Sequence, residues 1–406
     1  MRAVVQVLSF DLMAKVILGV LGIVLIRYMP AEEYADYVFG LALTAFVAQS
    51  VAATFNRVHV LSASAAPNGR HEWSLLGLQA TIVGVLAVLG LPLVADLGAA
   101  YFLVVLLVLA SCLSDFAKTC CQRDLQFFRF SMIELARALL FFGGAATLIA
   151  IGTGAVSAPS VIAIQTVSLL VVAWVALHRR SATWQATGPA AMARYGRELL
   201  RGDYAFLFAY FFVLGVFTQT DIFMLKIVGD ADMLATYGSA FRYYSILSLA
   251  LGAVHAVLLP TIQKLSTQAE LRAVLAMHRR VLALFGVVAL VAGWLAEWAI
   301  PWVDAGKYPD AVLSFRILCV SAVVSFAFSP YVNLLMRFEQ FGFLLGLILA
   351  ALALHVALSG ALIPGFGAAG AATATLVSAA VVTFSIFLKS RGLAIAAPAP
   401  DEPATP

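Results

Sequence analysis

Charged residues are scarce in this 406-residue chain. Asp, Glu, Lys and Arg make up 11% of it, whereas 63% of the residues are hydrophobic, and the mean hydropathy is +0.99. Soluble globular domains contain about 25% charged residues, so this chain could not expose its surface to water and stay dissolved. We therefore expect an all-α integral membrane protein. The formal net charge of +4 follows from the charge bias of the loops described below, so nucleic acid is not an expected partner.

Cysteine and nucleotide-binding motifs are also scarce or absent. The four cysteines are Cys112, Cys120, Cys121 and Cys319. They fall in apolar segments or at predicted cytoplasmic ends, where thiols stay reduced, and their spacing is not that of a metal site. We expect no metal and no cofactor. The sequence contains no Walker loop and no soluble nucleotide-binding domain, which excludes a one-chain ATP-driven pump.

Apolar segments long enough to cross a bilayer, about 20 residues each, fill most of the chain. We predict twelve spans, at 5–26, 34–55, 74–94, 98–116, 131–151, 158–177, 204–228, 233–258, 281–302, 311–335, 341–363 and 367–388. The first contains charged residues and has no small-residue cleavage site after it, so we expect an uncleaved helix rather than a signal peptide. The predicted outer loops are short and offer no room for an extracytoplasmic catalytic domain.

Basic residues divide unequally between the two sides of these spans. Of the 25 Lys and Arg residues, 18 fall on the side of the N-terminus and three, Arg27, Lys226 and Lys307, on the other. Positively charged loops stay in the cytoplasm, so both termini are predicted to be cytoplasmic. The remaining four, Lys15, Arg137, Arg242 and Arg316, lie inside spans and become the main candidates for function.

The two halves of the chain resemble each other. Ile26-Arg27 leads through Pro30 to Tyr37 much as Leu225-Lys226 leads through Gly229 to Tyr237, and Gly152 to Ala155 echoes Gly365 to Ala368. Both echoes occupy equivalent positions, and each half has six spans, so the copies have the same orientation. Parallel repeats of this kind are a transporter architecture with the substrate path between the halves. We predict six-helix bundles at 1–180 and 204–391, a basic cytoplasmic linker at 181–203 and a disordered tail at 392–406.

Several motifs occur in a telling order. Leu25 to Tyr34 reads L-x-R-x-x-P-x-x-x-Y; Asp221 is followed by Gly229, Tyr237, Ala240 and Arg242; Leu259-Pro260 closes the eighth span; and Pro364 to Ala371 reads PGFGAAGA. Over residues 1–390 the chain resembles polysaccharide flippases of the multidrug/oligosaccharidyl-lipid/polysaccharide exporter superfamily. It is somewhat short for the group and lacks the two additional C-terminal helices of lipid II flippases.

The resemblance implies twelve helices in two six-helix bundles around a central cavity. It also implies that undecaprenyl-diphosphate-linked oligosaccharides move from the cytoplasmic to the outer leaflet of a bacterial inner membrane, for surface or exopolysaccharide assembly. The expected partners are this lipid-linked substrate and membrane lipids, with a polysaccharide polymerase and chain-length machinery beside them. Two alternatives stay open: a cation-coupled multidrug exporter of the same superfamily, and a multi-span polysaccharide polymerase or ligase, against which the short outer loops argue.

A diphosphate and a sugar head need a wet path with cations, because neither enters hydrocarbon unaided. Lys15 is one candidate, although Asp11 lies four residues before it on the same helix face and could neutralise it. Arg242 and Asp221 lie at similar depths in adjacent spans, so they form either a structural ion pair or a substrate contact. All four are candidate cavity residues.

The secondary candidates each have a structural interpretation as well. Glu134 and Arg137 are three residues apart and could form a local pair, and Arg316 is close enough to the outer interface to snorkel. His255 and His355 could relay protons or simply pack. The aromatic runs from Tyr204 to Phe212 and from Phe241 to Tyr244 could stack on sugars or serve helix packing.

Overall fold

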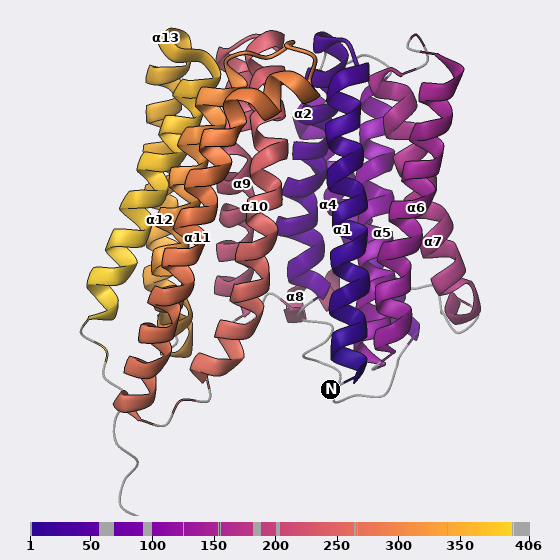
Figure 1. Cartoon of the computed structure of the whole chain (residues 1–406). Coiled ribbons are helices and arrows are strands. Elements are labelled where there is room, and N and C mark those ends of the chain that lie inside the picture. The colour runs from indigo at the N-terminus through magenta and orange to yellow at the C-terminus, as the bar shows by residue number, and fades with distance from the viewer. Residues whose placement is uncertain are drawn as a thin grey trace, which may run out of the picture.

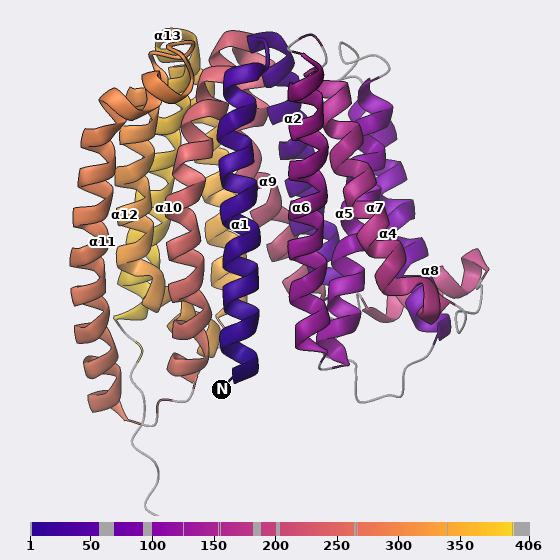
Figure 2. The ribbon, with the colours of Figure 1, turned by 45° about the vertical axis from the view of Figure 1, so that its right-hand side comes forward.

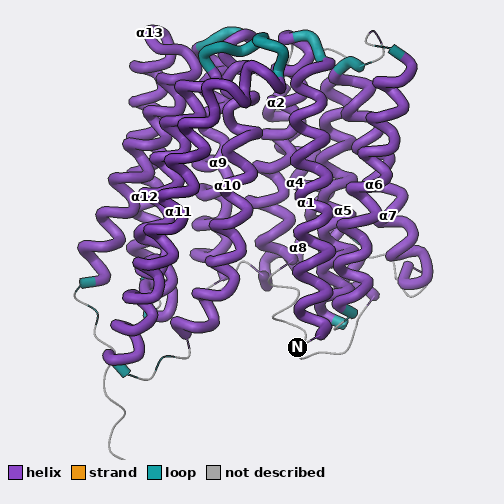
Figure 3. Tube along the Cα trace, in the orientation of Figure 1, coloured by secondary structure: helices purple, strands orange, loops and turns teal. Residues whose placement is uncertain are grey.

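A computed structural model describes most of the chain. It covers residues 2–56, 69–91, 100–124, 126–152, 154, 156–181, 188–199, 204–263, 265, 267–338, 340–391 and 393. The described part is a bundle of long helices that run between two faces, with short connections (Figures 1 and 3). We call the end at which α1 begins the N-terminal face and the end at which α1 stops the far face.

The described chain forms twelve α-helices and one π-helical segment. Their bounds are α1 Arg2–Tyr28, α2 Ala31–Val47, η1 Ala48–Ala52, α4 Gly69–Gly90, α5 Ala100–Arg123, α6 Phe127–Ile151, α7 Ala158–Ser181, α8 Pro189–Leu199, α9 Tyr204–Val228, α10 Ala231–Gln263, α11 Gln268–Val303, α12 Ala311–Arg337 and α13 Phe341–Ser390. In this part of the chain, nine helices are long and apolar enough to cross a membrane. The helices lie where the twelve spans were predicted, α13 carrying the last two, so the all-α membrane fold is confirmed.

The last two spans form one continuous element that reverses direction at Gly367. This residue has φ +54° and ψ −132°, in a region that side-chain-bearing residues rarely adopt. The two arms then lie so close that a Cβ on Gly370 would be 2.5 Å from the carbonyl oxygen of Leu362. The glycines of the PGFGAAGA motif therefore make a tight helical hairpin at the far face (Figure 1).

Two helices at the N-terminal face were not anticipated in full. α11 begins at Gln268, well before the predicted span at 281, because Thr267 and Glu270 form a capping box that starts the helix in the polar segment. The predicted linker contains α8, which packs on α4 with Met192 filling the space beside Gly77 (Figure 2). Arg194 and Arg197 of α8 are exposed, as in a helix lying at a membrane surface.

Helices α2 and α9 hold the two halves of the chain together. The π-helical turn η1 presents Gln49, which accepts a hydrogen bond from the Thr218 hydroxyl at 3.1 Å. A Cβ on Gly215 would meet the Phe46 carbonyl oxygen at 3.2 Å, so the two backbones approach closely. Aromatic pairs extend this contact toward both faces, including Phe55 with Phe208 and Phe39 with Phe223.

Some expectations lie beyond what the structure decides. Residues 394–406 of the predicted tail lie outside the described part of the chain. Which face is cytoplasmic stays a prediction from the charge bias. The division into bundles at 1–180 and 204–391 is taken up below as a proposal.

Candidate functional site between the two halves

Arg242 of α10 crosses from the C-terminal half to α1 and α2 of the N-terminal half. Its guanidinium fills the space beside Gly22, where a Cβ would lie 2.5 Å from Nε. Its charge lies within hydrogen-bonding range of the hydroxyls of Tyr34 and Tyr37. Among the described residues, no carboxylate lies within ion-pair distance of Arg242. The arginine therefore keeps its positive charge between the halves with hydroxyl neighbours only.

Four tyrosines form a cluster near the far face: Tyr34 and Tyr37 lie beside Arg242, and Tyr243 and Tyr308 lie within electrostatic range of Tyr34. The Tyr34 ring centroid lies 6.1 Å from that of Tyr308. Tyr34, Tyr37 and Tyr308 are buried, yet the hydroxyls of Tyr34, Tyr243 and Tyr308 have no geometrically ideal hydrogen bond in the described structure. Buried hydroxyls usually find a partner. The hydroxyls of Tyr34 and Tyr243 instead lie within range of Arg242 and Ser239, respectively.

The connection between α11 and α12 closes the far face over this cluster. Lys307 donates to the carbonyl oxygens of Arg27 at 2.5 Å and of Met29 at 3.0 Å, which are groups left without helical partners where α1 ends. Beside it Asp304 is fully buried, and burial raises the pKa of its carboxyl. The Lys307 contact fastens the C-terminal half to the N-terminal half at this face.

Lys15 shares a helix face with Gly22. Seven residues are close to two turns, so both side-chain positions point in nearly the same direction, about 10 Å apart along the axis. Gly22 contacts Arg242, so this face of α1 is turned toward the C-terminal half, and Figure 2 shows α1 between α6 and α10. Lys15 is exposed on it. Two basic side chains therefore follow one another along the contact between the halves. The side chain of Asp11 lies outside the described part.

The expected ion pair between Asp221 and Arg242 is wrong. Asp221 of α9 accepts a hydrogen bond from the Tyr237 hydroxyl and lies within ion-pair range of His355 Nε2 on α13. Equal depth in neighbouring helices was the basis for the pairing, but depth does not fix which way each side chain points. Asp221 points into the C-terminal half, whereas Arg242 points out of it.

The Asp221, Tyr237 and His355 side chains form a buried polar triad. Their exposed fractions are 5%, 0% and 1%. The imidazole approaches Asp221 off the line of an ideal hydrogen bond, and its Nδ1 has no partner among the described residues. The edge of the imidazole meets the Phe217 ring at a centroid distance of 5.4 Å. A titratable pair is thus enclosed by hydrocarbon with one nitrogen unused.

Glu134 and Arg137 pair with each other on α6, as the local interpretation expected. Lys118 of α5 also contacts Glu134, at 2.9 Å, and lies 3.8 Å from Asp115. The two acids and two bases neutralise one another inside the N-terminal half. This network explains the charges without a substrate.

Replacing Glu134 by Gln should lower the thermal stability of the detergent-solubilised protein. The change leaves Lys118 and Arg137 without their shared carboxylate, and breaking a buried pair costs about 3 to 5 kcal/mol. The matched control is Glu297→Gln. Glu297 pairs with Arg316 at 2.8 Å, but its side chain is 63% exposed, and exposed pairs contribute little. Equal melting temperatures for the two variants would contradict a structural role for the network.

The other secondary candidates are less informative. Arg316 donates hydrogen bonds to Glu297 and to the Gly293 carbonyl oxygen, both at 2.8 Å. It therefore forms a structural ion pair near the far face. The side chain of His255 lies outside the described part. In the described residues, no three His, Cys, Asp or Glu side chains gather as metal ligands would.

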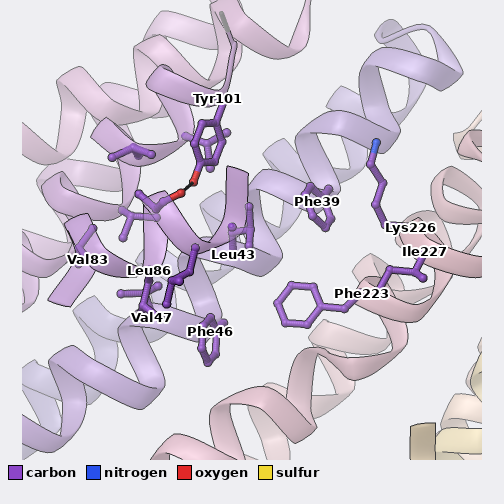
Figure 4. A pocket seen from close by; sticks show the side chains of 16 residues that line it. Phe39, Leu43, Phe46, Val47, Val83, Leu86, Tyr101, Phe223, Lys226 and Ile227 are labelled. Carbon is purple, nitrogen blue, oxygen red and sulfur yellow. Dashed lines mark hydrogen bonds between the residues drawn. The ribbon is translucent and has the colours of Figure 1, made fainter. Parts of the chain in front are cut away.

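An apolar pocket of about 350 Å³ lies on the other side of the contact between the halves. Figure 4 shows Phe39, Phe46 and Phe223 facing the gap between α2 and α9, with Lys226 at its edge. The Tyr101 hydroxyl donates a hydrogen bond to the Ala87 carbonyl oxygen at 2.6 Å. Hydrocarbon suits this lining, whereas a charged or hydroxylated group does not. Neither Lys15 nor Arg242 lines this pocket.

Comparison with known proteins identifies the architecture. No protein-family model and no curated protein sequence matches the chain. Among solved structures, the lipid II flippase MurJ in an inward closed conformation superposes with a TM-score of 0.79 at 10% identity, covering 95% of this chain and 87% of that one. An inward-facing multidrug resistance MATE family transporter of the MOP superfamily gives 0.64 at 13% identity, covering 95% and 97%. The chain has the fold of MOP superfamily transporters.

An outward-facing MATE family transporter of that superfamily gives a TM-score of 0.57 at 13% identity, covering 96% of this chain and 95% of that one. Of these three structures, the two in inward conformations give the higher TM-scores.

Two parts of the site in this MOP fold were missed from the sequence. Tyr34 and Tyr37 belong to the first motif, but nothing in their spacing shows that Tyr243 and Tyr308 join them. His355 was considered alone and its partner was not found. A carboxylate and a histidine in different spans predict a pair only once it is known which helices are neighbours.

Proposed function

We propose that the protein is a flippase for undecaprenyl-diphosphate-linked oligosaccharides in a bacterial inner membrane, with both termini in the cytoplasm. The observation that carries the proposal is Arg242, a cation between the halves with no carboxylate partner among the described residues. A diphosphate is the natural partner for such a guanidinium. The higher TM-score to a flippase than to MATE transporters supports it.

The rest of the path fits the two ends of this substrate. Lys15 lies on the same side of α1 toward the N-terminal face and would meet the diphosphate first. The tyrosine cluster suits a hydroxylated sugar head, because tyrosine offers both a ring face and a hydrogen-bonding hydroxyl. The polyprenyl tail would stay in lipid.

The proposed mechanism is alternating access between bundles at 1–180 and 204–391. Binding of the diphosphate to Arg242 would compete with the tyrosine hydroxyls and so loosen the far face. Release of Lys307 from the end of α1 would then let the halves separate there and close at the N-terminal face. Such rocking around a site at the repeat interface is expected of transporters built from repeats. A polymerase and chain-length machinery would receive the exported unit.

A second candidate is a cation-coupled exporter of small molecules. It is favoured by coverage, since the chain spans 97% of one MATE transporter but 87% of the flippase. It would require an acidic side chain open to the cavity. Asp221 is instead buried against His355 and Tyr237, which weakens this candidate. A polymerase or ligase gains no support, because the structural neighbours are transporters.

The test is transport in proteoliposomes that contain undecaprenyl diphosphate carrying a labelled disaccharide. A glycosidase added outside reports how fast the sugar reaches the outer leaflet. We expect the glycosidase to reach the labelled sugar at least tenfold faster than in liposomes that contain the labelled lipid but no protein. Unlabelled undecaprenyl diphosphate should compete with this transport, and ethidium should not. Export of ethidium without movement of the lipid would replace the flippase by the exporter.

Charge at Lys15 should control the rate of this reaction. Lys15→Ala should slow lipid transport by roughly twofold to tenfold, which corresponds to at most about 1.4 kcal/mol of free energy. Lys15→Arg should largely preserve the transport rate. The control is Arg280→Ala, which removes an exposed cation from α11 and should have no effect. If Lys15→Ala transports at the wild-type rate with normal insertion, Lys15 does not belong to the path.

A further inference from the structure

We propose that Asp221 and His355 bind the proton that couples transport to the proton gradient, and that sodium does not take this place. The inference rests on the proposed transport function and adds the coupling ion and its site. It starts from a carboxylate and an imidazole that contact each other on α9 and α13, both almost completely buried. Together they are the titratable core of the C-terminal half.

The charge of this pair depends on one proton. With the proton on the imidazole, the pair is an imidazolium and a carboxylate and has no net charge. Loss of the proton to water leaves a neutral imidazole and one uncompensated negative charge, which is costly within a hydrocarbon environment. Release of the proton therefore requires a conformation in which water reaches the pair.

The neighbouring titratable and charged groups are engaged elsewhere or lie outside contact with the pair. From α10, Tyr237 bonds to Asp221 and Tyr244 lies within its electrostatic range, with Cys319 of α12 beyond Tyr244. On α9 itself, Lys226 is engaged with Asp36 of α2 at 3.7 Å. Arg242 of α10 lies beside Tyr34 and Tyr37 of α2. Among the described residues, no further charged side chain contacts the pair.

The same geometry disfavours sodium. A hard cation takes several oxygen ligands, but one oxygen of Asp221 faces the imidazole and the other accepts the tyrosine hydroxyl. In the described part of the chain, no group of three or more His, Cys, Asp and Glu side chains gathers here. His355 thus occupies the position that a sodium ion would need.

The pair is placed to sense the conformational change. Asp221 is on the helix that contacts α2 across the halves, and Tyr237 is five residues from Arg242 on α10. His355 belongs to the first arm of the α13 hairpin, whose second arm brings Thr375 within hydrogen-bonding range of Tyr237. Protonation therefore acts on three helices of one half at once, and a change in their packing alters access to the proton.

The test measures the conformational equilibrium without any substrate. Spin labels are attached at the exposed positions Gln122 and Met277 on the N-terminal face, and in a second protein at Ile151 and Asp310 on the far face. The four native cysteines, which are buried and unbonded, are replaced by alanine. Distances are recorded in lipid nanodiscs from pH 5 to pH 9, with sodium or with choline as the cation.

We expect both distance distributions to shift across this pH range, equally in sodium and in choline. Asp221→Asn and His355→Gln should each abolish the shift. The matched control is His278→Gln. His278 is a buried histidine of the same half, but its ring nitrogen contacts the Phe326 carbonyl oxygen at 3.0 Å, and the shift should remain.

Tyr237→Phe covers the case in which the other variants fail to fold. It keeps the pair but removes the hydroxyl that bonds to Asp221, so the pH dependence of the distances should change; an unchanged pH dependence would contradict the proposal. A wild-type protein that ignores pH would overturn the inference and leave the flippase assay untouched. A shift driven by sodium and lost in Asp221→Asn would identify a sodium site instead. A pH shift combined with a failed lipid assay would reject the flippase and keep the proton site.

Discussion

Arg242→Gln should reduce lipid transport at least tenfold, which corresponds to about 1.4 kcal/mol, while the protein accumulates normally in the membrane. The physical reason is the missing carboxylate. Among the described residues, the guanidinium has tyrosine hydroxyls and no carboxylate as hydrogen-bonding neighbours, so its removal exposes no buried negative charge there, but it deletes the cation that would hold a diphosphate. Transport by purified protein and its melting temperature check the two parts of this expectation.

Two further variants make the result specific. Arg316→Gln removes another arginine from a predicted span, one that is paired with the exposed Glu297, and should leave transport unchanged. The double variant Arg242→Gln with Asp221→Asn should gain nothing over the single variant. If Arg242→Gln instead depleted folded protein and Asp221→Asn restored it, the two residues would be a structural pair and the diphosphate site would have to be sought elsewhere.

Gly370→Ala should destabilise the protein by about 3 kcal/mol or more, at or beyond the upper end for overpacking. A Cβ at this position would lie 2.5 Å from the Leu362 carbonyl oxygen and 3.1 Å from the Ile363 nitrogen. These are backbone atoms of the opposite arm and cannot rotate away, so the α13 hairpin would have to open. Thermal unfolding of the detergent-solubilised protein measures the loss.

Gly365→Ala is the matched control for this substitution. It lies in the same PGFGAAGA motif, but a Cβ there would meet nothing within 4 Å. Alanine is also the better helix former, so stability should be unchanged or slightly higher. Similar losses in both variants would show that the motif is sensitive to any substitution and that close approach is not the reason.

The sequence was a good guide where one helix could be considered at a time. The predicted span at 131–151 coincides with α6 and contains the local pair of Glu134 and Arg137. It was a poor guide at helix ends in polar segments. The capping box of Thr267 and Glu270 starts α11 in a charged segment that lies before the apolar span.

Hydropathy determined the number of membrane spans and their membrane character, because those properties depend on segments of about 20 residues and on the solvent around them. Only the tertiary structure decided the partners of Asp221. Arg242 and His355 were both basic groups available in other spans, and their depths did not distinguish them. The choice depends on how α9, α10 and α13 are rotated about their axes when they pack, and that rotation follows from contacts among all the helices rather than from any one of them.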